Sequence, residues 1–278
     1  MRSAAALLLA ILSVPVAANE AAVDVLHFDG FESPAAAGWR LGQLALRDPH
    51  VFYPLPIGPT TACIDATDLP NIGLNPQIAA SLSADDDANG TLDSSALLVF
   101  RPLRTDGAPG RVTTVPAACS VATPTQCAVD AGAVASTRIY RTFLPTGSDH
   151  CLEPLPGTTS SWGSGAAVPQ PGGACYATAA GDLVLESAGL AIPLFDTAFG
   201  APLPGAAPTG GGLMRGFLRA SDAAQISVDA NGTQRTLASL LPGGAGSCKS
   251  NVTGGVDTWN GETGWWFYFE YRQDAVTL

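Results

Sequence analysis

Residues 264–272 read Gly-Trp-Trp-Phe-Tyr-Phe-Glu-Tyr-Arg, the densest aromatic run of the chain. Aromatic residues favour strands, and successive side chains of a strand point to opposite faces of its sheet. One face of the expected strand therefore carries Trp265, Phe267, Phe269 and Tyr271. Because this face is aromatic throughout, the run predicts a strand that packs against a hydrophobic core.

The opposite face of this strand carries Trp266 and Tyr268, followed by Glu270 and Arg272. Aromatic rings beside charged groups are suited to stacking against sugar rings, so Trp266 and Tyr268 are the candidate ligand-binding residues. A strand covered on both faces explains the same pattern, because a buried strand can be apolar throughout. The sequence therefore leaves two interpretations of this face, a sugar platform and simple packing.

The rest of the chain also favours strands over helices. It contains 31 glycines and 22 prolines, and both residues destabilise or interrupt helices. One short helix is expected at Thr236–Leu241, where leucines recur at helical spacing before Pro242. Strands separated by turn-forming clusters are expected at Val23–Phe28, Leu41–Leu46, Gln77–Leu82, Leu97–Arg101, Ser136–Leu144, Asp182–Glu186, Leu213–Leu218, Gln225–Val228 and Gly264–Arg272. The predicted fold is all-β and mainly antiparallel, a β-sandwich or jelly-roll-like arrangement with long disulfide-anchored loops and one or two short helices.

The N-terminus has the features of a secretory signal peptide. Arg2 supplies a positive charge, residues 4–14 form an uncharged apolar run, and Val16-Ala17-Ala18 places small residues at a cleavage site. The apolar run is too short to span a bilayer, which needs about 20 residues. We expect residues 1–18 to be removed, residues 19–278 to form a single β-sandwich domain, and the product to be secreted or periplasmic without membrane insertion.

The charge of the chain argues against two kinds of partner. Without residues 1–18 it has 12 basic and 24 acidic side chains, a net charge of −12, and Lys249 is its one lysine. Binding to nucleic acid or to anionic lipid needs clustered cations, and the basic residues of this sequence are scattered. Nucleic acids and anionic membranes are therefore excluded as expected partners.

Six cysteines follow the expected signal peptide, and an even number in an exported chain indicates three disulfides. None of them has the Cys-x-x-Cys spacing of zinc or redox sites. The preferred pairing joins Cys119 to Cys127 and Cys151 to Cys175, each across a Pro/Gly-rich loop, and leaves Cys63 to pair with Cys248. Because Cys151 and Cys175 anchor the long loop 145–176, this loop is not read as a linker between domains.

An acidic segment, Asp85-Asp86-Asp87-Ala88-Asn89-Gly90-Thr91-Leu92-Asp93, resembles the calcium loop of EF-hands and dockerins. The resemblance implies oxygen ligands from Asp85, Asp87, Asn89, the Thr91 carbonyl and Asp93, with Gly90 at the sharp turn. The segment departs from the family at its last ligand position, where Ala96 replaces a bidentate glutamate. No flanking helix pair is expected either, so calcium would have a structural role. A solvated acidic turn is the alternative.

The segment Phe28-Asp29-Gly30-Phe31-Glu32-Ser33, followed by Gly38-Trp39, resembles the opening of exported concanavalin-like sandwiches. Its Asp-Gly-Phe-Glu-Ser string is also similar to one in uncharacterised exported bacterial proteins. The resemblance covers about twelve residues and implies a sandwich that contacts carbohydrate. A packed first strand, with Phe28, Phe31 and Trp39 in the core, explains the same residues.

The sequence offers little for catalysis. Gly163-Ser164-Gly165 is not a nucleophile elbow, and His27, His50 and His150 do not form a metal-binding motif. The leading expectation is an exported, non-catalytic β domain that binds carbohydrate or a cell surface and holds a structural calcium. The alternatives are a secreted glycan hydrolase or lyase that uses a carboxylate pair, and a purely structural envelope protein.

Overall fold

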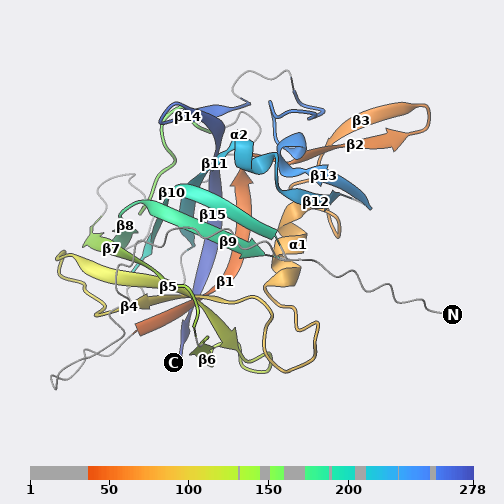
Figure 1. The fold of residues 1–278 in the computed structure, drawn as a ribbon. Coiled ribbons are helices and arrows are strands. Elements are labelled where there is room, and N and C mark those ends of the chain that lie inside the picture. The colour runs from red at the N-terminus through yellow and green to blue at the C-terminus, as the bar shows by residue number, and fades with distance from the viewer. Residues whose placement is uncertain are drawn as a thin grey trace. The chain divides into compact units, whose positions relative to one another are not determined.

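The computed structural model describes residues 37–130, 132–144, 151–159, 173–187, 190–203, 211–230, 232–250 and 255–278. They belong to one compact unit, Pro34–Leu278, whose strands are shown in Figure 1. The expected signal peptide, the expected strand Val23–Phe28 and the Asp29–Ser33 string lie outside the described residues.

Eight antiparallel strands form a closed barrel. In chain order they are β1 (Ala37–Asp48), β4 (Ala96–Phe100), β5 (Gly110–Cys119), β7 (Ser136–Phe143), β8 (Cys175–Thr178), β10 (Leu190–Pro202), β11 (Gly212–Arg219) and β15 (Glu262–Val276). Each strand pairs with the next one in this series, and β15 pairs back with β1 (Figure 1). This order is that of an up-and-down barrel.

The remaining described elements lie outside the eight strands of the barrel. Three strands extend the sheet: β6 (Cys127–Val129) beside β5, β9 (Gly181–Ser187) beside β10, and β14 (Asp257–Trp259) beside β15. Two separate hairpins are formed by β2 (Phe52–Ile57) with β3 (Thr60–Asp65), and by β12 (Ser227–Ala230) with β13 (Thr233–Thr236). The helices are α1 (Leu74–Ser81), α2 (Ala220–Ala223) and the 3₁₀ helix η1 (Leu237–Leu240).

The prediction of an all-β, mainly antiparallel fold is confirmed, but the sheet closes into a barrel instead of forming the two facing sheets of a sandwich. The long strand β15 makes the closure, because Gly264–Tyr271 pairs with β11 and Tyr268–Val276 pairs with β1. The β1–β15 register also shifts twice, and such irregularities bend and twist a strand. Alternating apolar residues are common to both architectures, so the pattern alone does not separate them.

The expected strand Gln77–Leu82 is wrong, since these residues belong to α1 and its C-terminal cap. Ile78 is buried and Leu74 partly buried, and this i, i+4 spacing places both on one helix face against the core. Pro76 lies in the first turn, where a proline costs no helical hydrogen bond. The expected helix at Thr236–Leu241 is found as the shorter η1.

Aromatic rings fill the barrel interior. Phe100 makes edge-to-face contacts with Trp39, Tyr140 and Tyr176, at centroid distances of 5.0–5.2 Å. Two of the buried hydroxyls pair with each other, since those of Tyr176 and Tyr271 lie 2.9 Å apart. Burial raises the pKa of both tyrosines above the usual value. Gly110 leaves room for the Tyr140 ring, because a Cβ there would lie 2.4 Å from it.

All three disulfides have the predicted pairing. Cys119–Cys127 joins β5 to β6, and Cys151–Cys175 ties the segment 151–159 to β8. Cys63–Cys248 links the β2–β3 hairpin to the segment after η1, across 185 residues of sequence. The described cysteines are thus all oxidised, and the longest link connects two parts of the chain that lie outside the barrel wall.

Candidate functional site

A broad groove crosses the outer face of the barrel where β1 meets β15. Its volume is about 770 Å³, and α1 forms one wall through Asn75, Pro76 and Ala79. Its polar lining consists of Gln43, Arg47, Asp68, Asn75, Glu270 and Arg272. Gln43 and Arg272 are exposed and directly opposite in the strand register. The groove therefore presents donors and acceptors side by side to solvent.

An ion pair lies along this groove and crosses the seam of the barrel. Nε of Arg47 donates to Oε2 of Glu270 at 2.8 Å, and Nη2 lies 2.7 Å from the same oxygen. The Arg47 side chain is 41 % exposed and that of Glu270 is 27 % exposed. Two arginines and two acids thus share the lining, so the groove carries no excess charge of one sign and is suited to a neutral polar ligand.

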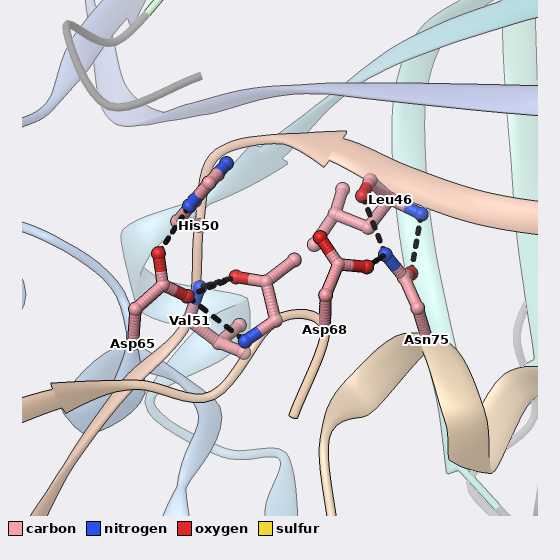
Figure 2. A network of polar contacts seen from close by, with 7 residues as sticks. Leu46, His50, Val51, Asp65, Asp68 and Asn75 are labelled. Atoms are coloured by element: carbon pink, nitrogen blue, oxygen red, sulfur yellow. Dashed lines mark hydrogen bonds and ion pairs between the residues drawn. The ribbon is translucent and has the colours of Figure 1, made fainter. Parts of the chain in front are cut away.

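A network of buried hydrogen bonds fixes α1 against β1 (Figure 2). The Asn75 side chain accepts from the Leu46 N–H at 2.7 Å and donates to the Leu46 carbonyl at 2.9 Å. It also donates to Asp68 at 2.7 Å. One side chain therefore satisfies the backbone of a barrel strand and holds the helix that walls the groove.

A second part of the network joins His50 to Asp65, and Figure 2 shows the pair beside Val51. Nδ1 of His50 lies 2.5 Å from Oδ2 of Asp65, and Oδ1 of Asp65 accepts from the N–H and the hydroxyl of Thr67. The hydrogen bond to Asp65 raises the pKa of His50. Burial raises the pKa of Asp65, but the bonds from His50 and Thr67 outweigh it and leave that pKa below its usual value.

These shifts predict a window of pH in which the pair stabilises the fold. The raised pKa of His50 gives a contribution to the stability of the fold. This contribution is complete below the pKa of His50 in the unfolded chain, about 6.5, and is lost as the pH rises through the pKa of His50 in the folded protein. The lowered pKa of Asp65 gives a second contribution to the stability of the fold. This contribution is complete above about pH 4 and is lost on acidification. Asp65→Asn should therefore flatten the decline in melting temperature as the pH rises above about 6.5, measured by circular dichroism. Asp106→Asn is the control, and an unaltered profile for Asp65→Asn would contradict the assignment.

The structure brings together three of the five expected calcium ligands. One carboxylate oxygen from each of Asp85, Asp87 and Asp93 lies within 4.8 Å of the others. Oxygens on opposite sides of one Ca²⁺ are about 5 Å apart, so the spacing suits a single ion. The Asn89 side-chain oxygen instead accepts from the N–H and hydroxyl of Thr91, and an ion would have to share it.

Secondary structure frames the acidic segment on both sides. Helix α1 ends at Ser81 just before it and strand β4 begins at Ala96 just after it, so a single helix precedes the loop where the sequence predicted none. The Leu92 N–H donates to the Cys119 carbonyl at 2.8 Å, and the Val121 N–H donates to the Gly90 carbonyl at 3.0 Å. The segment is therefore held against the Cys119–Cys127 disulfide.

The predicted sugar platform is not at the surface. Trp266 is 2 % exposed and Tyr268 is fully buried. They pack with Leu213 and Phe217, and Leu152 and Leu155 of the disulfide-tied segment pack on them. The Leu155 N–H donates to the Tyr268 hydroxyl at 3.0 Å. The second face of β15 is thus a packed cluster, which is the alternative that the sequence also allowed.

Two carboxyl groups interact at the end of β1. Asp48 is 2 % exposed, and its charge adds to the effect of burial on Asp257. Burial is the larger cause, and although Asp257 accepts from the Trp266 N–H at 2.9 Å, its pKa is raised to about 6. Neither residue contributes to the lining of the groove.

Comparison with protein-family models, with curated proteins and with solved structures gives no match. Within the described ranges, the helices are too short to cross a membrane.

Proposed function

We propose that the protein is an exported, non-catalytic barrel that binds a neutral glycan, such as one on a cell surface, in the groove between β1, β15 and α1. The observation that carries this proposal is the groove of about 770 Å³ with paired donors and acceptors along its length. Sugar hydroxyls both donate and accept hydrogen bonds, so they match amide, guanidinium and carboxylate groups arranged side by side. The balanced charge of the lining favours a neutral sugar over an anionic one.

Export of the chain is supported by its N-terminal pattern and its three disulfides. Disulfides persist in oxidising compartments and are rare in the cytosol. The N-terminal pattern of Arg2, an apolar run and small residues at 16–18 supplies the route out of the cell. In a secreted or periplasmic location the groove would face extracellular or envelope glycans.

A glycan array followed by calorimetry on the best ligand tests the proposal. Gln43→Ala and Glu270→Gln should each weaken binding about tenfold, because each removes hydrogen bonds that a sugar makes to the groove. Arg111→Gln is the matched control, since Arg111 is exposed on β5, away from the groove lining. Absence of any glycan ligand, or equal affinity for all the variants, would overturn the assignment.

A structural calcium ion in the loop 85–93 is the second part of the proposal. It is supported by the convergence of Asp85, Asp87 and Asp93 and by the position of the loop against a disulfide. Carboxylate oxygens are the ligands that Ca²⁺ prefers, and the ion would offset the repulsion between the three acids. Since Ala96 offers no carboxylate, the affinity should be modest.

Calcium should stabilise the folded protein in proportion to its binding. At a free calcium concentration 100 times Kd, the free energy of unfolding should rise by about 2.7 kcal/mol, and EDTA should reverse the gain. Asp87→Asn should abolish most of the effect, whereas Asp130→Asn, an exposed acid outside the loop, should preserve it. Identical melting curves in calcium and in EDTA would show that the loop binds no ion.

The hydrolase alternative depends on a pair of carboxyl groups, and Asp48 with Asp257 is the pair that favours it. A carboxyl with a pKa of about 6 suits a general acid. Neither Asp48 nor Asp257 lines the groove. This separation of the carboxyl pair from the groove supports a protein that binds a glycan without cleaving it. Hydrolysis of the array ligand by the native protein, lost in Asp257→Asn, would select the enzyme instead.

A further inference from the structure

An apolar cavity of about 220 Å³ lies at one end of the barrel. Its floor is formed by Leu44 of β1 and by Phe267 and Phe269 of β15, which belong to the interior face of the barrel. Its walls come from Ile78 of α1, Ile192 of β10 and Leu237 of η1. These five elements, which are distant in sequence or separate in the sheet, therefore enclose one space.

The cavity has an opening to solvent. Leu44, Ile78, Leu237, Phe267 and Phe269 are buried. Ile72 is 44 % exposed, and Gln77 and Asp229 are exposed. These three residues also belong to the lining, so they mark a rim through which a molecule can enter.

The size of the cavity restricts what it can hold. Protein interiors are close-packed and keep few voids larger than a water molecule. An apolar cavity of about 150 Å³ stays dry and binds benzene, whereas pockets for drug-sized ligands begin at about 300 Å³. A space of 220 Å³ therefore fits a compact molecule larger than benzene, of one or two fused rings.

One lining residue has an unsatisfied polar group. Tyr53 of β2 is 6 % exposed, and its hydroxyl is buried without a hydrogen-bond partner among the residues that the structure describes. A buried hydroxyl without a partner is costly, and most native structures avoid it. Since Tyr53 lines the cavity, a ligand with one polar atom can supply the missing bond.

Charge at the rim selects against an anion. Among the described residues that line the cavity, Asp229 is the one carboxylate and none is basic. A bound carboxylate would face this acid without a cation to pair with, and removing a charge from water into an apolar space is strongly unfavourable. The occupant should therefore be neutral.

We propose that the barrel-end cavity is a second binding site, for a small neutral apolar molecule that carries a single hydroxyl group. Eight-stranded barrels are wide enough to hold one small ligand at or near their mouth, and this cavity has that position. The proposal is independent of the glycan groove, because Leu44 alone belongs to both linings.

The Cys63–Cys248 disulfide fixes the walls of this site. Cys63 pairs with Pro54 in the β2–β3 hairpin, next to Tyr53, and Cys248 follows η1, which supplies Leu237 and Leu240. The ammonium group of Lys249 also lies 5.5 Å from the centre of the Phe52 ring, another lining residue. Two walls from opposite ends of the sequence are thus covalently joined, which preserves the shape of the cavity.

Calorimetric titration of the native protein with three matched probes tests the site. 2-Naphthol has the required ring size and one hydroxyl, naphthalene lacks the hydroxyl, and 2-naphthoate replaces it with an anion. We expect 2-naphthol to bind most tightly, naphthalene three- to tenfold more weakly, and 2-naphthoate not to bind. Absence of 2-naphthol binding at millimolar concentration, or preference for the anion, would overturn the proposal.

Variants locate the bound probe. Ile78→Phe fills part of the cavity with a larger side chain and should weaken 2-naphthol binding at least tenfold, with an unchanged or higher melting temperature. Ile139→Phe makes the same change on an exposed face of β7 and should not affect binding. Tyr53→Phe should weaken 2-naphthol binding three- to tenfold and leave naphthalene unaffected. If Ile78→Phe fails to fold, Leu237→Phe fills the cavity from the opposite wall, and full affinity in the filled variant would place the probe elsewhere.

Discussion

Trp265→Ala is expected to lower the free energy of unfolding by about 3–5 kcal/mol. Trp265 is 2 % exposed, so its truncation leaves a large void in the core. Its indole N–H also donates to the carbonyls of Pro242 and Gly255, at 2.9 and 2.7 Å. These bonds hold the segments before and after Cys248 against β15, and both carbonyls would lose a buried donor.

Guanidinium denaturation measures this loss, and Trp265→Phe separates its two causes. Phenylalanine retains most of the buried apolar area but cannot donate to either carbonyl, so the loss should fall to about 1–3 kcal/mol. A midpoint that stays the same in Trp265→Ala would show that the indole does not support the core.

Removal of the Cys63–Cys248 disulfide should have a comparable effect. The double variant Cys63→Ala with Cys248→Ala opens a loop of 185 residues, for which the chain-entropy relation gives a loss of about 5 kcal/mol. The matched variant Cys119→Ala with Cys127→Ala opens a loop of 8 residues, for which the same relation gives about 2.5 kcal/mol. Urea unfolding of the two variants compares these losses directly.

The order of the two losses is the decisive result. If the short-loop variant is the less stable of the two, strain or local packing at Cys119–Cys127 outweighs the entropy of the unfolded chain. The long-loop variant should in addition bind 2-naphthol more weakly, because it releases the β2–β3 hairpin that carries Tyr53.

The sequence identifies the local elements of this fold well. Five expected strands lie in barrel strands and extend at most one residue beyond them: Leu41–Leu46, Leu97–Arg101, Ser136–Leu144, Leu213–Leu218 and Gly264–Arg272. The disulfide pairing is also confirmed, since pairing the cysteines that lie nearest in sequence across two loops left one remaining pair. Periodicity and spacing are local properties, and these features depend on little else.

Closure of the sheet and both binding sites depend on contacts that no local pattern contains. The groove forms where Gln43 lies beside Arg272. The cavity forms where Ile78, Leu237 and Phe267, from elements far apart in sequence, come together. Helix α1 was missed because Gln77–Leu82 is too short to separate the helical from the strand period. The sequence leaves a sugar platform open for Trp266 and Tyr268 because the segment that covers them, around Leu152 and Leu155, has no sequence signal of its own.

The pairing of the first and last barrel strands should make this protein a slow folder. Gly38 pairs with Val276, so the seam cannot form until residues 38–276 have been synthesised and arranged. Until then β1 and β15 expose unpaired edges, and β15 carries the densest aromatic run of the chain, a combination that favours aggregation. Refolding yield should therefore fall steeply with protein concentration.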